Sequence, residues 1–72
     1  MQQTYKDHSI EVDARPAPDV EGRWRVYVTV TYHEGDSMHT QPLSFKDART
    51  FASKTEAEAA GLALGKAHID RR

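Results

Sequence analysis

The stretch FASKTEAEAAGLALGKAHID, residues 51–70, decides the fold. It contains Ser53-Lys-Thr-Glu56, a capping box in which the serine hydroxyl accepts from a free amide of the first turn and the glutamate carboxylate reaches back. Thr55-Glu-Ala-Glu58 offers the same pattern two residues later, so either residue can begin the helix. These boxes predict one helix over about residues 54–70.

One face of this helix is made mostly of small side chains. At about 100° per residue, that face collects Ala57, Ala60, Gly61, Leu64, Ala67 and His68. Small residues allow a helix axis to lie close to a sheet, so we expect this face to be buried. Gly61 is explained by such close packing, whereas Gly65 has no explanation in this register.

Leu62 and Ile69 lie on another line of the same helix, about 140° away from the small-residue face, with Gly65 between them. They are either scattered exposed aliphatics, or Ile69 folds over the edge of the sheet, or the line is a second contact surface. A chain this short needs extra burial, which favours contact with a twin subunit or another protein. Leu62, Gly65 and Ile69 are therefore the candidate partner or self-association surface.

Upstream of the helix the sequence alternates with period two, which is typical of half-buried strands. Residues 8–14 place Ile10 and Val12 on one side, and residues 23–32 do the same with a run of valines. Gly35 lies in a polar turn that favours a hairpin, and Pro42 indicates an edge or a bulge in the returning strand. The predicted strands cover about residues 5–14, 23–33 and 37–46.

The predicted fold is α+β, with a three-stranded antiparallel β-meander packed against one C-terminal helix in a single domain, residues 1–72. The inward positions of all elements together predict the core. Its expected members are Ile10, Val12, Trp24, Val26, Val28, Val30, Leu43, Phe45, Phe51, Ala57, Ala60, Leu64 and Ala67.

The composition limits the functional classes. The 72 residues carry a net charge of -1 and no cysteine, so disulfides, thiolate metal sites and a thiol nucleophile are excluded. The first seven residues lack the apolar run of a signal peptide, and no stretch is apolar over a bilayer's width. We therefore predict a cytoplasmic protein without membrane contact, metal or cofactor.

The polar residues do not form a recognisable catalytic motif. His33 and His39 flank the turn and can face each other, but a zinc site needs at least one further ligand. His68 is expected as a half-buried ring against an aromatic such as Trp24, rather than as a ligand-facing imidazole. No glycine-rich phosphate loop or serine elbow is present, and the prediction is that the protein is not an enzyme.

The outward positions of the central strand give an alternative. Arginines next to an aromatic residue on a sheet can lie in a DNA groove or stack on bases, whereas the acidic net charge and Glu11 and Asp13 on the same face oppose this. The candidate nucleic-acid surface consists of Arg23, Arg25, Tyr27, Thr29 and Thr31.

Two resemblances bear on the fold. Gly22-Arg-Trp24, Phe51-x-Ser53-x-x-Glu56-Ala57 and Gly65-Lys66-x-x-Ile69-Asp70 resemble a group of small bacterial proteins with a β-β-β-α order, in which Trp often stands where this chain has His68. This resemblance implies a fold and no activity. The first two of these segments are also similar to the arm-type DNA-binding domains of tyrosine recombinases, a likeness at the level of fold.

The sequence therefore predicts a small non-catalytic domain that binds another protein or its own copy. Nucleic-acid binding through the outer face of the sheet is the alternative.

Overall fold

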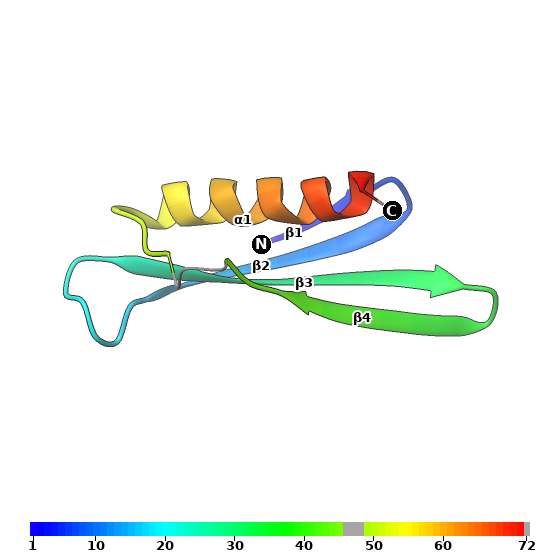
Figure 1. Ribbon diagram of the computed structural model, residues 1–72, viewed down its shortest axis with the longest axis horizontal. Coiled ribbons are helices and arrows are strands. Elements are labelled where there is room, and N and C mark those ends of the chain that lie inside the picture. The colour runs from blue at the N-terminus through cyan, green and yellow to red at the C-terminus, as the bar shows by residue number, and fades with distance from the viewer. Residues whose placement is uncertain (46–48, 72) are drawn as a thin grey trace.

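The computed structural model describes residues 1–45 and 49–71. These residues form a four-stranded antiparallel sheet, in the order β1-β2-β3-β4, and one helix that lies across one face of it (Figure 1). The elements are β1 (Gln2–Tyr5), β2 (His8–Pro16), β3 (Trp24–Glu34), β4 (Ser37–Leu43) and α1 (Lys54–Asp70). The α+β class and the antiparallel sheet agree with the sequence prediction.

The strand count differs from the prediction. A single strand over residues 5–14 was expected, but Lys6 and Asp7 form a tight turn with φ of 48° and 64°, and β1 pairs with β2 on its other side. Two successive residues with positive φ are the signature of a type I′ hairpin. The meander therefore has four strands. The predicted end of the last strand, residue 46, lies outside the described residues.

The second hairpin is closed by Gly35 and Asp36, which connect the paired residues Glu34 and Ser37. Gly35 has a φ of 62°, and the described residues with positive φ do not include Asp36, so the turn is of type II′. Its twist matches that of the strands. β3 and β4 consequently form a long ribbon that projects beyond the C-terminal end of α1 (Figure 1).

The core lies between α1 and the sheet. Alternate residues of β2 and β3 point toward the helix, and the fully buried large side chains are Ile10, Val12, Val28 and Val30. The predicted aromatic and leucine members are only partly buried and pack around this centre; they are Trp24, Leu43, Phe45, Phe51 and Leu64.

The helix begins as predicted, since the Ser53 hydroxyl accepts from the Glu56 N–H at 3.1 Å. Its buried face agrees with the prediction only at Ala57 and Gly61, because the residues closest to the sheet follow an i, i+4 line. They are Ala57, Gly61, Gly65 and Ile69. Ala60, Leu64 and Ala67, which were predicted to be core residues, lie beside this line and are partly buried.

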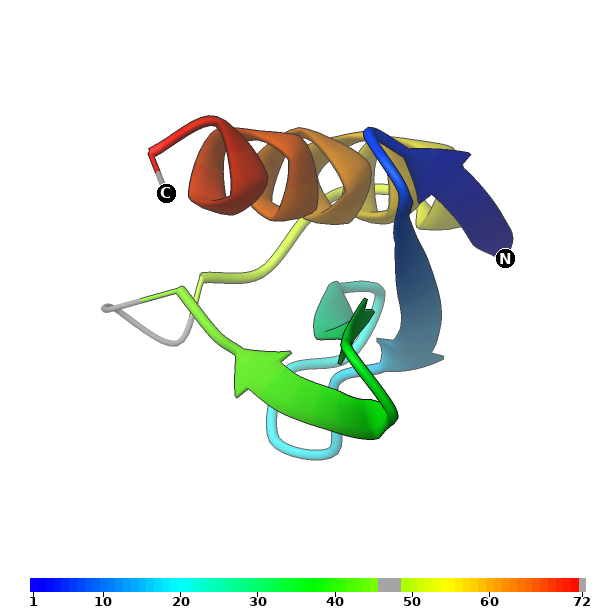
Figure 2. The ribbon, with the colours of Figure 1, turned by 90° about the vertical axis from the view of Figure 1, so that its right-hand side faces the viewer.

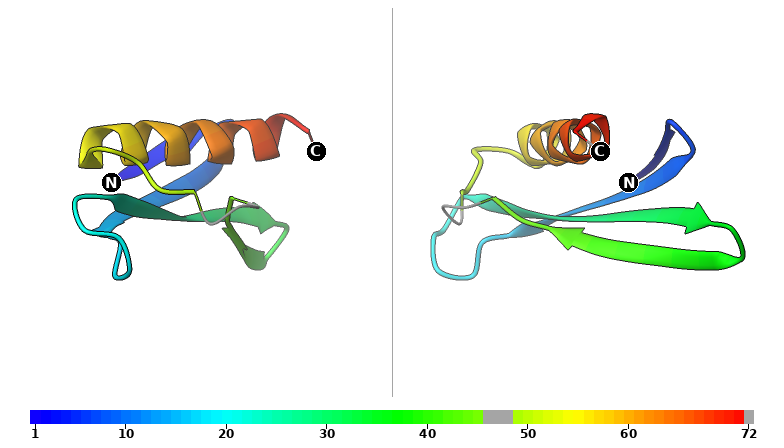
Figure 3. Two further views of the ribbon diagram at one scale, coloured as in Figure 1. Left: turned by 60° about the vertical axis from the view of Figure 1, so that its left-hand side comes forward. Right: turned by 45° about the vertical axis from the view of Figure 1, so that its right-hand side comes forward.

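The two edges of the sheet are unlike. β1 rises to the level of the helix, whereas β4 lies on the far side of the sheet (Figure 2). Two turned views show the same separation (Figure 3). Lys6 Nζ lies 2.6 Å from Asp70 Oδ1, and the Tyr5 hydroxyl donates to both Asp70 oxygens at 3.0 and 3.1 Å. The β1–β2 turn is thus tied to the last turn of α1.

The hydrogen bonds from Lys6 and Tyr5 hold the pKa of the Asp70 carboxyl below its usual range, and Asp70 in turn raises the pKa of Lys6. Both groups are exposed, so this tie is a small stabilising contribution. It is present at neutral pH, and it is lost as the pH falls through the lowered pKa of Asp70 or rises through the raised pKa of Lys6.

Neighbouring residues of β3 should differ in their sensitivity to truncation. Val28 is 2% exposed and faces α1, whereas Thr29 faces away from it. We expect Val28→Ala to lower the free energy of unfolding by about 2 kcal/mol and Thr29→Ala by less than about 1 kcal/mol, since only the first leaves a cavity. Urea denaturation measures both values, and equal losses would contradict this inward face.

Candidate functional site

The predicted surface of Leu62, Gly65 and Ile69 is not an open surface. Ile69 is 5% exposed, and a Cβ placed on Gly65 would lie 2.8 Å from Ile10 Cγ2. Leu62 is partly buried against the same core. Gly65 and Ile69 therefore face the sheet, and of the three residues only Leu62 leaves part of its side chain exposed.

The arginines of the predicted nucleic-acid surface are already engaged within the chain. Arg25 donates to both carboxylate oxygens of Asp19 at 3.0 and 3.1 Å. Arg23 is directed to Thr50, where it donates to the hydroxyl at 3.1 Å and to the carbonyl at 2.9 Å. Arg23 precedes β3, whereas the other four members alternate along one outer face of that strand.

Acidic residues lie directly beside that outer face. Glu11 is paired with Thr29 and Asp13 with Tyr27 across β2 and β3. Arg15 donates to Asp13 at 2.7 Å and also lies over the ring of Tyr27, which is 51% exposed. Because cations and anions alternate here, the face offers phosphates little net attraction. Nucleic-acid binding stays a prediction that no contact in this face favours.

His33 and His39 do not face each other as the sequence suggested. His33 is paired with Met38 and His39 with Tyr32, so their side chains lie on opposite faces of the ribbon. His39 instead stacks on Tyr32, with ring centroids 5.1 Å apart, and His8 lies 5.4 Å from the other side of Tyr32. The three rings form a row across β2, β3 and β4 on the face that carries the helix.

His68 contacts a different residue from the one that the sequence predicted. His68 Nε2 lies 3.2 Å from Gln41 Oε1, so this partly buried ring is held by β4 and not by Trp24.

Within residues 1–45 and 49–71, no three His, Cys, Asp or Glu side chains are grouped closely enough to hold a metal ion. This part of the chain also has no helix with the length and apolar content of a membrane span.

The outer edge of β4 is a second candidate surface. β4 ends the strand order, and its residues 37–42 are all exposed. It is longer than β1, with seven residues against four, and apart from His39 it has no ionisable side chain. Sheet edges are commonly blunted by lysines, by proline, by shortness or by a covering element, and of these features β4 has only Pro42, next to its last residue.

The hairpin register shows which groups of this edge are available. In a two-residue hairpin the pair next to the turn, Glu34 and Ser37, is hydrogen-bonded, and hydrogen-bonded pairs then recur at every second position. The backbone N–H and C=O groups of Met38 and Thr40 consequently point away from β3. Pro42 falls at another outward position, so its missing N–H removes no bond from the sheet.

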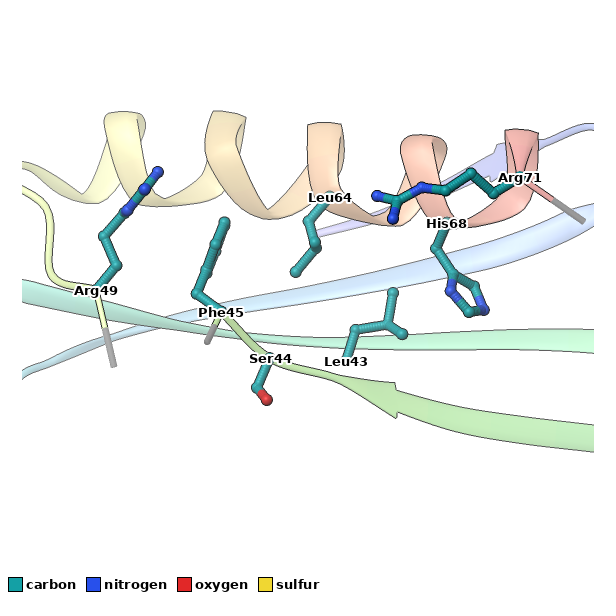
Figure 4. Close-up of a pocket in the computed structure, with 7 residues that line it drawn as sticks. All are labelled: Leu43, Ser44, Phe45, Arg49, Leu64, His68 and Arg71. Atoms are coloured by element: carbon teal, nitrogen blue, oxygen red, sulfur yellow. The ribbon is translucent and has the colours of Figure 1, made fainter. Parts of the chain in front are cut away.

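A groove between α1 and the chain that follows β4 is a third candidate (Figure 4). It has a volume of about 410 Å³. Its apolar side chains come from both sides, with Leu43 and Phe45 opposite Leu64 on the helix. The polar residues that line it are Ser44, Arg49, His68 and Arg71. Sequence reasoning missed this site because its members are distributed over three segments.

Comparison of the chain with protein-family models, with curated proteins and with solved structures gave no match.

Proposed function

We propose that this protein is a non-catalytic, self-associating module in which the β4 edges of two copies pair to form one continuous sheet. The observation that carries the proposal is the open edge of β4, with six consecutive exposed residues and only one ionisable side chain. Pairing of two such edges satisfies backbone groups that a monomer leaves to water.

The strand is suited to a second copy of itself. An antiparallel pair related by a two-fold axis at His39 places Met38 of each copy opposite Thr40 of the other. Each of these residues has its N–H and C=O pointing outward, so this register makes four backbone hydrogen bonds. Pro42 lies outside the bonded segment and does not interfere. No formal charge of one β4 meets a like charge in the other, apart from protonated histidine.

The other edge offers no comparable surface. β1 has four residues, and its turn is tied to Asp70 of the helix through Lys6. A chain of 72 residues also has a small core, so burial between two copies adds stability that one copy cannot reach by itself. These points support pairing through β4 rather than through β1.

The test is a proline at an outward position of each edge. Thr40→Pro removes an outward N–H without removing a bond to β3, in the same way as the natural Pro42. Sedimentation velocity over a dilution series should show a monomer–dimer equilibrium for the unmodified chain and a monomer for Thr40→Pro. Thr4→Pro is the matched control, because register also places the Thr4 N–H outward on the β1 edge, and it should still dimerise.

A second control separates the backbone from the side chain. The Thr40 hydroxyl lies 3.4 Å from that of Thr31, and Thr40→Val removes this contact but keeps the N–H. Thr40→Val should dimerise as the unmodified chain does. A concentration-independent monomer mass for the unmodified chain, or equal dimerisation of the two proline variants, would overturn the proposal.

A further inference from the structure

The groove between α1 and the residues after β4 combines an apolar floor with two arginines. Leu43, Phe45 and Leu64 are each only partly buried and line it from both sides. Arg49 enters from the connection before α1 and Arg71 from the end of α1, so that they flank Phe45 and Leu64 (Figure 4).

These two arginines differ from those elsewhere in the chain. Arg15 and Arg25 each form an ion pair with an aspartate. Among the described residues no carboxylate lies within ion-pair distance of Arg49 or Arg71; the guanidinium carbon of Arg49 instead lies 5.5 Å from the centre of the Phe45 ring. The groove therefore presents positive charge that the described part of the chain does not neutralise.

We propose that this groove binds a small organic carboxylate with an aromatic or branched apolar body. An apolar body would cover the exposed parts of Leu43, Phe45 and Leu64, and the acid group would accept from the guanidinium groups at the rim. A volume of about 410 Å³ is suited to a ligand of this size. Ser44 and His68 also line the groove, but the Ser44 hydroxyl points away from α1 (Figure 4) and His68 Nε2 contacts Gln41.

The site is independent of the proposed dimer. The bonded segment of β4 is Met38 to Thr40, whereas the groove begins at Leu43. The titration can therefore be carried out on the unmodified chain and on Thr40→Pro, and both should bind the ligand equally.

The probe is hydrocinnamate, a phenyl ring joined to a carboxylate by two methylene groups, and its matched neutral analogue is hydrocinnamyl alcohol. In methyl-labelled protein followed by two-dimensional NMR, the acid should shift the methyl signals of Leu43 and Leu64. The alcohol, which keeps the apolar body and lacks the charge, should bind at least about tenfold more weakly, as expected when a charge-assisted hydrogen bond is lost.

Substitutions of Arg49 and Arg71 test whether the preference for the acid over the alcohol arises from the arginines at the rim of the groove. Arg49→Gln and Arg71→Gln should each lower the affinity for hydrocinnamate by roughly tenfold and leave the weak binding of the alcohol unchanged. Arg15→Gln, on the other side of the sheet, is the control of equal charge change and should bind the acid normally. Equal affinity for acid and alcohol, loss of binding in Arg15→Gln as well, or methyl shifts away from Leu43 and Leu64 would each overturn the assignment.

Discussion

Gly61→Ala should lower the free energy of unfolding by about 2 kcal/mol, although alanine is the better helix former by about 1 kcal/mol. A Cβ at this position would lie 2.7 Å from Val26 Cγ2, 2.9 Å from Val12 Cγ1 and 3.1 Å from Val28 Cγ2. All three valines are buried and branched at Cβ, so none can rotate away freely. The helix would have to move outward from the sheet, which would loosen contacts along its whole length.

The control is a glycine–alanine exchange at an exposed position of the same helix. Ala63 faces solvent, and Ala63→Gly should lower the stability by about 1 kcal/mol through helix propensity alone. Urea denaturation of both variants separates the two effects, since alanine is unfavourable at residue 61 and favourable at residue 63. An increase in stability for Gly61→Ala would show that α1 does not approach β2 and β3 this closely.

Gly65 also explains where sequence reasoning failed on the helix, since Ala57 and Gly61 were correctly expected on the buried face. A helical wheel of hydrophobicity gives weight to Leu64 and Ala60 and almost none to Gly65. The closest approach to a sheet, however, is decided by which side chains are absent. The predicted face therefore left out Gly65 and Ile69. Ile69 is 5% exposed, which agrees with the alternative that it folds over the sheet and not with an exposed contact line.

The strands were predictable to the extent that their burial alternates. Ile10, Val12, Val26, Val28 and Val30 are buried, as period two predicted. β1 carries no such signal, because Gln2-Gln-Thr-Tyr5 is polar and mostly exposed on both sides. Its turn uses Lys6 and Asp7 instead of a glycine, so a single strand was the simpler interpretation of the sequence.

The candidate sites depend on tertiary structure to different degrees. Pro42 already indicated an edge, and the edge is where β4 lies. Which of its amides point outward follows only from the register of the β3–β4 hairpin. The groove needs still more, because Phe45, Arg49 and Arg71 become neighbours only when α1 folds back over the sheet.

The contact between Gly65 and Ile10 gives the second large effect. Ile10 is fully buried, and Ile10→Ala should lower the free energy of unfolding by about 3 kcal/mol through loss of burial and the cavity it leaves. A Cβ on Gly65 would meet Ile10 Cγ2 at 2.8 Å and Cδ1 at 3.2 Å. Gly65→Ala alone should therefore cost about 1 kcal/mol despite its gain in helix propensity.

The two changes should compensate when combined. Ile10→Ala removes the atoms that a Cβ at residue 65 would strike, and the new methyl group fills part of the cavity. The double variant should be more stable than the sum of the single losses by about 2 kcal/mol. Val26→Ala combined with Gly65→Ala is the control, since Val26 contacts the position of Gly61 one turn earlier, and this pair should be additive within about 0.5 kcal/mol. Additivity of the Ile10 pair as well would mean that Gly65 is retained for a reason other than its approach to β2.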